Sequence, residues 1–148
     1  MHKQAVDEFM QAAIAQARKS RSEGGIPIGS ALMRDGQLLA AGHNKRVQEN
    51  DPVTHAEIDC LRQAGRIGSF KGTVLYSTLM PCYLCAGAVV QFGIPKVIVG
   101  ENRTFAGAAE FMQSHGVEVI NLDLPECVEM MTRFIAEHSE LWNEDIGR

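Results

Sequence analysis

The sequence lacks both a long apolar segment and a cluster of basic residues. No apolar run approaches the roughly 18 residues that a membrane helix needs, and the N-terminal residues contain no apolar stretch of the signal-peptide kind. The 14 Lys and Arg residues are outnumbered by 18 Asp and Glu, which gives a net charge of −4. We therefore expect a cytoplasmic protein with no membrane and no nucleic acid as its partner, acting on a small or uncharged molecule.

Linkers, repeats and low-complexity stretches are also missing, so nothing in the sequence marks a domain boundary. Hydrophobic residues make up 45% of the 148 and charged residues 22%, as in ordinary globular proteins. A chain of this length buries about two-thirds of its unfolded surface without disulfides or other staples. The sequence thus predicts a single domain over residues 1–148.

Cysteine is sparse, and its four copies are unevenly spaced. Cys82 and Cys85 form a C-x-x-C pair, whereas Cys60 and Cys127 stand alone inside apolar helical patterns. Without a secretory signal, such a pair indicates metal binding or redox chemistry rather than a structural disulfide. The two isolated cysteines are expected in the hydrophobic core, although sequence alone does not exclude Cys127 from a metal site.

Hydrophobic periodicity predicts an α/β fold. Helices are expected over residues 3–22, 54–63, 82–91, 108–114 and 125–138, and strands over 28–33, 38–41, 73–78, 96–100 and 117–122. The Asp-Gly between the first two strands indicates a hairpin. After this hairpin, strands and helices alternate, which predicts a three-layer α/β/α sandwich around a mixed, mostly parallel five-stranded sheet.

Two short segments at predicted helix starts carry metal-ligating residues. His55 begins the triplet H-A-E, and Pro81 begins the segment P-C-Y-L-C. Cys82 and Cys85 lie about 60° apart on a helix, so both thiolates can bind one ion. Together with the imidazole of His55 they provide three ligands and leave a fourth tetrahedral position for water, which is the pattern of a catalytic zinc site. The sequence therefore predicts one zinc ion per chain.

Glu57 has two interpretations. It can form a capping box with Thr54 at the start of the helix, or it can move protons beside the metal. On an ideal helix Glu57 lies about 200° from His55, so the two converge only if His55 sits in an irregular first turn. However, H-x-E followed by P-C-x-x-C is the signature of zinc nucleobase deaminases, in which the Glu is the acid and base and not a ligand. This combination favours a catalytic Glu57 over a structural zinc module or a redox pair.

Beyond the metal motifs, the whole chain resembles the fungal-type cytosine deaminases, a branch of the cytidine deaminase superfamily. The resemblance rests on GGIPIG at 24–29, GHN at 42–44, GIPKVIVGEN at 93–102 and LWNEDIG at 141–147. It implies zinc-dependent hydrolysis of cytosine, a small nucleobase, to uracil and ammonia. It also implies a homodimer.

The resemblance also implies roles for individual residues. Asn44 corresponds to the residue that hydrogen-bonds the pyrimidine edge, and Asp145 to the one that meets the exocyclic amine. Phe105 and Trp142 match the aromatic residues that enclose the ring, with Ile28 beneath it. An amide beside aromatic walls suits a flat uncharged ring.

Three further expectations concern the edges of this site. The backbone N–H of Ala56, at a helix start, is expected to orient the base. Met80 departs from the fungal pattern, which has a small hydroxyl residue before the motif's proline, so isocytosine, guanine or a similar base is the alternative substrate. Editing of transfer-RNA adenosine and a non-catalytic zinc module are less favoured. Residues 139–148 are expected to close over the site and to exclude a ribose, because Trp142 would be costly to leave in water.

Overall fold

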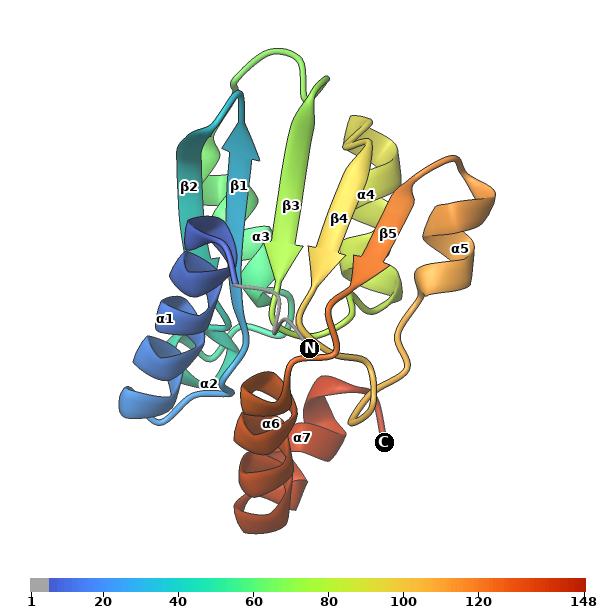
Figure 1. The fold of residues 1–148 in the computed structure, drawn as a ribbon. Coiled ribbons are helices and arrows are strands. Elements are labelled where there is room, and N and C mark those ends of the chain that lie inside the picture. The colour runs from blue at the N-terminus through green and yellow to red at the C-terminus, as the bar shows by residue number, and fades with distance from the viewer. Residues whose placement is uncertain (1–5) are drawn as a thin grey trace.

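A computed structural model describes residues 6–148 and contains a five-stranded sheet in the order β2-β1-β3-β4-β5 (Figure 1). β1 (Gly29–Arg34) pairs antiparallel with β2 (Gln37–His43) and with β3 (Thr73–Ser77). β3, β4 (Lys96–Val99) and β5 (Glu118–Asn121) pair in parallel. β1 thus runs opposite to the other four strands, and the predicted mixed, mostly parallel sheet is confirmed.

Helices cover both faces of the sheet, as the three-layer prediction requires. α1 (Glu8–Ser22) packs across β1 and β2 on one face. α3 (Ala56–Ala64), α4 (Tyr83–Phe92) and α5 (Ala109–Ser114) lie on the other face, behind the sheet in Figure 1. Because α3 and α4 start near the end of the sheet where β2, β3 and β4 finish, their N-termini face the same region.

The remaining helices lie at this same end of the sheet. α6 (Pro125–Glu137) begins with a proline in its first turn, as predicted, and α7 (Ser139–Asp145) packs against it. Both lie below the strands in Figure 1. α2 (Arg46–Glu49) was not predicted, because four residues are too few to show a helical period.

Local side-chain chemistry sets two of the element boundaries. α1 starts at Glu8 rather than near residue 3, because the Asp7 carboxylate caps it by accepting hydrogen bonds from the amides of Phe9 and Met10. Residues 3–5 of that predicted helix lie outside the described part. In the β1–β2 hairpin, the Asp-Gly pair at 35–36 has positive φ at both positions, as a tight two-residue turn demands.

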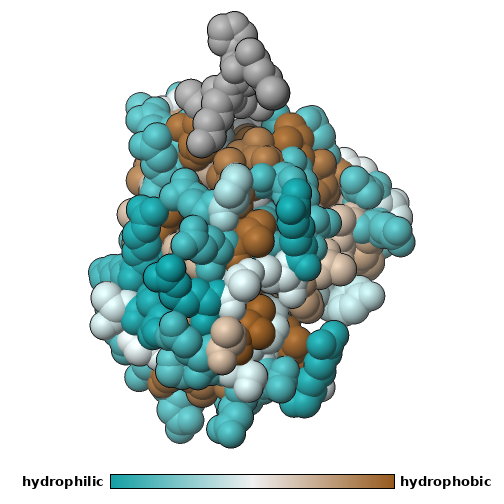
Figure 2. Space-filling model, turned by 60° about the horizontal axis from the view of Figure 1, so that its bottom comes forward, coloured by the Kyte–Doolittle hydropathy of each residue, from teal (hydrophilic) through white to brown (hydrophobic). Residues whose placement is uncertain are grey.

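Apolar clusters fill both sides of the sheet. Cys60 is buried in the cluster beneath α3 and α4, and Cys127 in the cluster beneath α1, which confirms both as core residues. Seen with the α6–α7 end turned forward, the surface is mainly hydrophilic, and apolar side chains gather toward the top of the view (Figure 2). Within residues 6–148, no helix has the length and apolarity needed to cross a bilayer.

Candidate active site and metal centre

α3 and α4 each begin with a predicted metal ligand at the N-cap. His55 caps α3 and Cys82 caps α4, both with extended backbone rather than helical geometry. The predicted capping box is wrong: the Thr54 hydroxyl instead donates a hydrogen bond to Asp51, 2.8 Å away. Since His55 precedes the helix, its side chain is freed from the helical period. It therefore lines the same cavity as Glu57.

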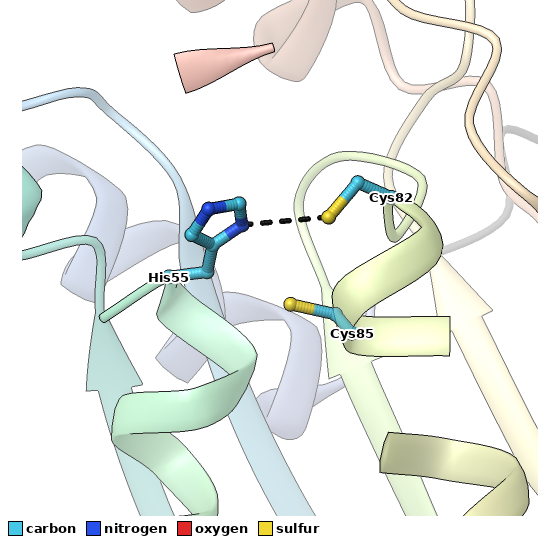
Figure 3. A group of neighbouring side chains, drawn as sticks. All are labelled: His55, Cys82 and Cys85. Atoms are coloured by element: carbon cyan, nitrogen blue, oxygen red, sulfur yellow. Dashed lines mark hydrogen bonds between the residues drawn. The ribbon is translucent and has the colours of Figure 1, made fainter. Parts of the chain in front are cut away.

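The three predicted ligands converge on one point (Figure 3). His55 Nδ1 lies 3.5 Å from Cys82 Sγ, and the ligand atoms of His55, Cys82 and Cys85 all lie within 4.8 Å of one another. An imidazole nitrogen and a thiolate bound to one tetrahedral zinc at about 2.1 and 2.3 Å are separated by roughly 3.6 Å, so the observed spacing fits the ion.

The other two cysteines are directed elsewhere. Cys60 Sγ donates to the carbonyl of Ala40 at 3.6 Å, inside the core. Cys127 Sγ packs against Gly100, where a Cβ would come within 2.7 Å of the sulfur. Among the described residues, the metal-binding group contains three protein ligands, which leaves a tetrahedral ion one open position. The predicted catalytic form of the zinc site is thus the form that the donor set supports.

The ionisation of the ligands suits metal capture. A hydrogen bond from Cys85 and the nearby imidazole lower the pKa of Cys82 to about 4, although burial opposes this. The same hydrogen bond, together with burial, raises the pKa of Cys85 well above its usual value. Burial lowers the pKa of His55, but its contact with Cys82 and nearby carboxylates outweigh that effect and raise it to about 8. Metal binding requires a neutral imidazole and two thiolates, so it releases protons from this cluster.

Glu57 is the buried acid of the site. Its side chain belongs to the first turn of α3, and the residue is only 4% exposed. Burial, reinforced by the charge of Cys82, raises the pKa of Glu57 to about 7. A carboxyl group with this pKa can both accept and return a proton near neutral pH, which is what a general acid and base must do.

A small cavity lies in front of Glu57 and the metal ligands. It brings together every predicted substrate-binding residue, and it also includes Leu79 and Ile146, which the sequence did not single out. The lining consists of Ile28, Asn44, His55, Ala56, Glu57, Leu79, Met80, Cys82, Phe105, Trp142, Asp145 and Ile146. Its walls are apolar except for one polar edge of carboxylates, amide and imidazole. Such a cavity suits a flat ring with polar atoms along one side.

The polar edge joins two segments that are 101 residues apart in sequence. Asn44 Nδ2 donates to the Asp145 carboxylate at 3.3 Å, and His55 Nε2 lies 3.9 Å from it. Arg46 was not predicted as a site residue, yet its guanidinium lies 3.4 Å from Asp145 and its amide donates to Asn44 Oδ1 at 3.0 Å. Its place two residues after Asn44 was the sole sequence signal that could have identified it.

Aromatic and apolar side chains close the rest of the cavity. Phe105 and Trp142 meet edge to face with ring centroids 5.7 Å apart. Trp142 is 5% exposed, so α7 is docked over the cavity. The backbone N–H of Ala56, in the first turn of α3, has no intrahelical acceptor and is placed to donate to a ligand.

Within residues 6–148, the wider grooves lack this chemistry. The groove between α1 and α6 contains paired surface charges, such as Arg18 with Glu126 and Arg21 with Glu137. Those charges are exposed and satisfy one another. The small cavity remains the place where a metal site, a buried acid and apolar walls meet.

An open zinc site beside a buried carboxylate, on an α/β/α sandwich, defines a zinc-dependent hydrolytic enzyme. Residues 3–101 match the family model described as "Cytidine and deoxycytidylate deaminase zinc-binding region". The chain belongs to this family of zinc-dependent deaminases, which act as hydrolases on C–N bonds. The donor set of His55, Cys82 and Cys85 fits the zinc ion of this family.

Relatives with different substrates share most of the chain. A cytosine deaminase of Candida albicans is 44% identical over 93% of this chain and 94% of its own length. A tRNA-specific adenosine deaminase of Bacillus subtilis is 33% identical over 87% of this chain and 88% of its own. The solved structure of a dCMP deaminase from cyanophage S-TIM5 aligns with a TM-score of 0.61 and 26% identity, covering 76% of this chain and 93% of that one.

Proposed function

We propose that this chain deaminates a free pyrimidine base, converting cytosine and water to uracil and ammonia. The observation that carries the proposal is the small cavity, in which Glu57 and the metal ligands lie along one polar edge and apolar side chains form the remaining walls. The 44% identity to a cytosine deaminase supports the choice of base.

Each residue of the site has its own role in this reaction. Zinc, when bound by the three ligands, supplies an acidified water as the nucleophile at neutral pH. Glu57 accepts a proton from that water and delivers it to ring nitrogen N3, which makes C4 electrophilic. The oxygen of that water bonds to C4, and Glu57 takes the second proton from the resulting hydroxyl group and passes it to the amine. The C4–N bond then breaks, which releases ammonia and leaves the C4 carbonyl of uracil. Asn44 and the Ala56 amide hold the ring edge, and Asp145 meets the departing amine.

A free base fits this site better than a base within a nucleic acid. α7 places Trp142 and Asp145 over the cavity, which leaves little space for a ribose. The net charge of −4 on the chain also disfavours binding of a phosphate backbone.

Glu57 variants test the proposed reaction. Glu57→Ala and the nearly isosteric Glu57→Gln are expected to keep zinc and the fold but lose at least about 10²–10⁴-fold in cytosine turnover, since proton transfer is removed. Ammonia release from a panel of bases and nucleosides, with zinc content measured on each protein, provides the test. Near wild-type turnover by either variant, or a preference of the wild type for cytidine, isocytosine or guanine, would overturn the assignment.

We further propose that the chain forms a homodimer through the outer face of α4. This helix contains no charged residue, and Tyr83, Leu84 and Phe92 are 77%, 45% and 51% exposed. Gly87 lies between them, and a Cβ there would meet no atom within 4 Å, so a neighbouring helix can approach closely. Leu84→Glu is expected to yield a monomer in light scattering after gel filtration. Leu38→Glu, on the similarly exposed β2, is the matched control and should leave the mass unchanged.

A cytoplasmic role in pyrimidine salvage completes the proposal. All four cysteines are free of disulfides, and two of them must stay as thiolates to hold zinc. Such a site persists best in a reducing compartment.

A further inference from the structure

Glu101 is a buried carboxylate that the proposed mechanism does not use. It follows β4 and is 0% exposed. Its Oε2 accepts hydrogen bonds from the backbone amides of Arg103 and Thr104, at 2.7 and 3.0 Å, and its Oε1 accepts one from the Thr104 hydroxyl. Among residues 6–148 it forms no salt bridge, since the Arg103 guanidinium pairs with Asp123 instead.

Burying this carboxylate costs free energy that a loop without a buried charge would not incur. A buried carboxylate without a cation is stable only when its oxygens are fully hydrogen-bonded. The loop can therefore adopt few arrangements other than the one that presents both amides and the hydroxyl to Glu101. A neutral residue would hold the loop with less constraint, because hydrogen bonds to a charged acceptor are the stronger ones.

The backbone is equally constrained at Gly100, where the loop begins. Gly100 donates its amide to Ser77 and accepts from Leu124, at 2.8 and 2.7 Å. A Cβ on Gly100 would lie 2.5 Å from the carbonyl oxygen of Thr78, so the chain is tightly packed at this point. The position of Glu101 is thus fixed by the sheet on one side, while its carboxylate fixes the loop on the other.

Two walls of the cavity depend on this one residue. Phe105 directly follows the residue that Glu101 holds by two hydrogen bonds, and its ring packs against Trp142. The backbone carbonyl of Glu101 accepts the amide of Met80 at 3.0 Å, and Met80 lines the cavity as well. We propose that Glu101 is a positioning residue that holds Phe105 and Met80 in place and thereby sets how tightly the cavity grips the base. This inference rests on the proposed function for its kinetic consequence.

Glu101→Gln is the principal test, since it keeps the shape but removes the charge. Phe105 contacts the base both before and during the reaction, so a misplaced Phe105 weakens both kinds of binding alike. We expect KM for cytosine to rise about 10-fold with a smaller change in kcat. Arg103→Ala is the matched control. It removes an exposed side chain that does not contact Glu101, and the backbone amide of residue 103 can still donate to the Glu101 carboxylate. Its KM should stay near that of the wild type.

A second readout does not depend on catalysis. Trp142 is the single tryptophan of the chain, and it packs on Phe105. Its fluorescence therefore reports whether Phe105 has moved. We expect Glu101→Gln to increase quenching of Trp142 by acrylamide in the zinc-loaded protein, whereas Arg103→Ala should not. This measurement stands even if cytosine proves not to be the substrate, so the two proposals fail separately.

A double-mutant cycle distinguishes positioning from stability. In a Phe105→Ala background, Glu101→Gln should raise KM much less than it does in the wild type, because the wall it positions is already absent. A lower melting temperature with unchanged KM and unchanged Trp142 quenching would show a merely structural role and overturn the inference. If Glu101→Gln does not fold, Thr104→Val removes the hydroxyl bond alone and is expected to give a smaller change of the same kind.

Discussion

Replacing Trp142 by alanine tests whether α7 completes the active site. Trp142 is 5% exposed and packs edge to face on Phe105. Burying a tryptophan removes about 150–250 Å² from water, which at about 25 cal/mol per Å² corresponds to roughly 4–6 kcal/mol. Core Trp→Ala substitutions cost about 3–5 kcal/mol, so the variant loses most of what docks this seven-residue helix.

The loss should appear in substrate binding rather than in metal binding. If about 3 kcal/mol of the docking energy is coupled to the base, KM for cytosine rises about 10²-fold. Trp142→Phe keeps an apolar aromatic wall, so its KM for cytosine should lie between the values for Trp142→Ala and the wild type. Deleting residues 139–148 should raise KM at least as much as Trp142→Ala, or abolish turnover, while zinc content stays at one per chain.

Three measurements test whether α7 takes part in substrate binding: steady-state kinetics, limited proteolysis of residues 139–148 and zinc analysis. Trp142→Ala is expected to expose the 139–148 segment to protease and to raise KM in parallel. A tail that becomes protease-sensitive while KM and kcat remain those of the wild type would refute the reasoning. It would mean that α7 covers the cavity without taking part in binding.

Three other outcomes are expected. Arg46→Leu removes the guanidinium beside Asp145 and should raise KM at least about 10-fold, measured by steady-state kinetics, since it leaves a buried carboxylate without its cation. Gly107→Ala would place a Cβ 2.4 Å from Met80 Cγ at a φ of +71°, so it should lower kcat/KM and the melting temperature, and Met80→Ala in the same chain should restore part of the activity. In zinc-free protein at pH 6, iodoacetamide should label Cys82 quickly, because its pKa is about 4. The two core cysteines, with pKa values raised to about 12, should stay unreactive. Mass spectrometry of the zinc-loaded protein should show that Cys82 is protected from labelling.

Much of the fold follows from local sequence signals. Hydrophobic periodicity identified the strands and five of the helices within a few residues, since their apolar faces repeat clearly. The α1 boundary was missed because the apolar pattern begins before Asp7, whereas a side-chain cap determines where the helix starts. α2 was missed because so short a helix is set by its surroundings and not by its own pattern.

The site was predictable in composition but not in geometry. Residue spacing identified His55 and the cysteine pair, yet it placed Thr54 as the cap, and the structure gives that position to His55. The proximity of Asn44 and Asp145, 101 residues apart, came from family resemblance and not from any local pattern. Arg46 escaped because only the folded chain brings its side chain to the C-terminal helix.

The two N-cap ligands have a consequence for the chain as a whole. His55 and Cys82 are 27 residues apart, and the segment between them contains all of α3 and β3. An ion bound to both therefore acts as a covalent-like cross-link that closes this loop, and for a loop of this length the chain-entropy relation for cross-links gives about 3–4 kcal/mol. The reactive centre then also ties together two helices of the same layer, α3 and α4. Removing the metal should lower the unfolding temperature as well as the activity, and the loss of each should follow the same chelator titration.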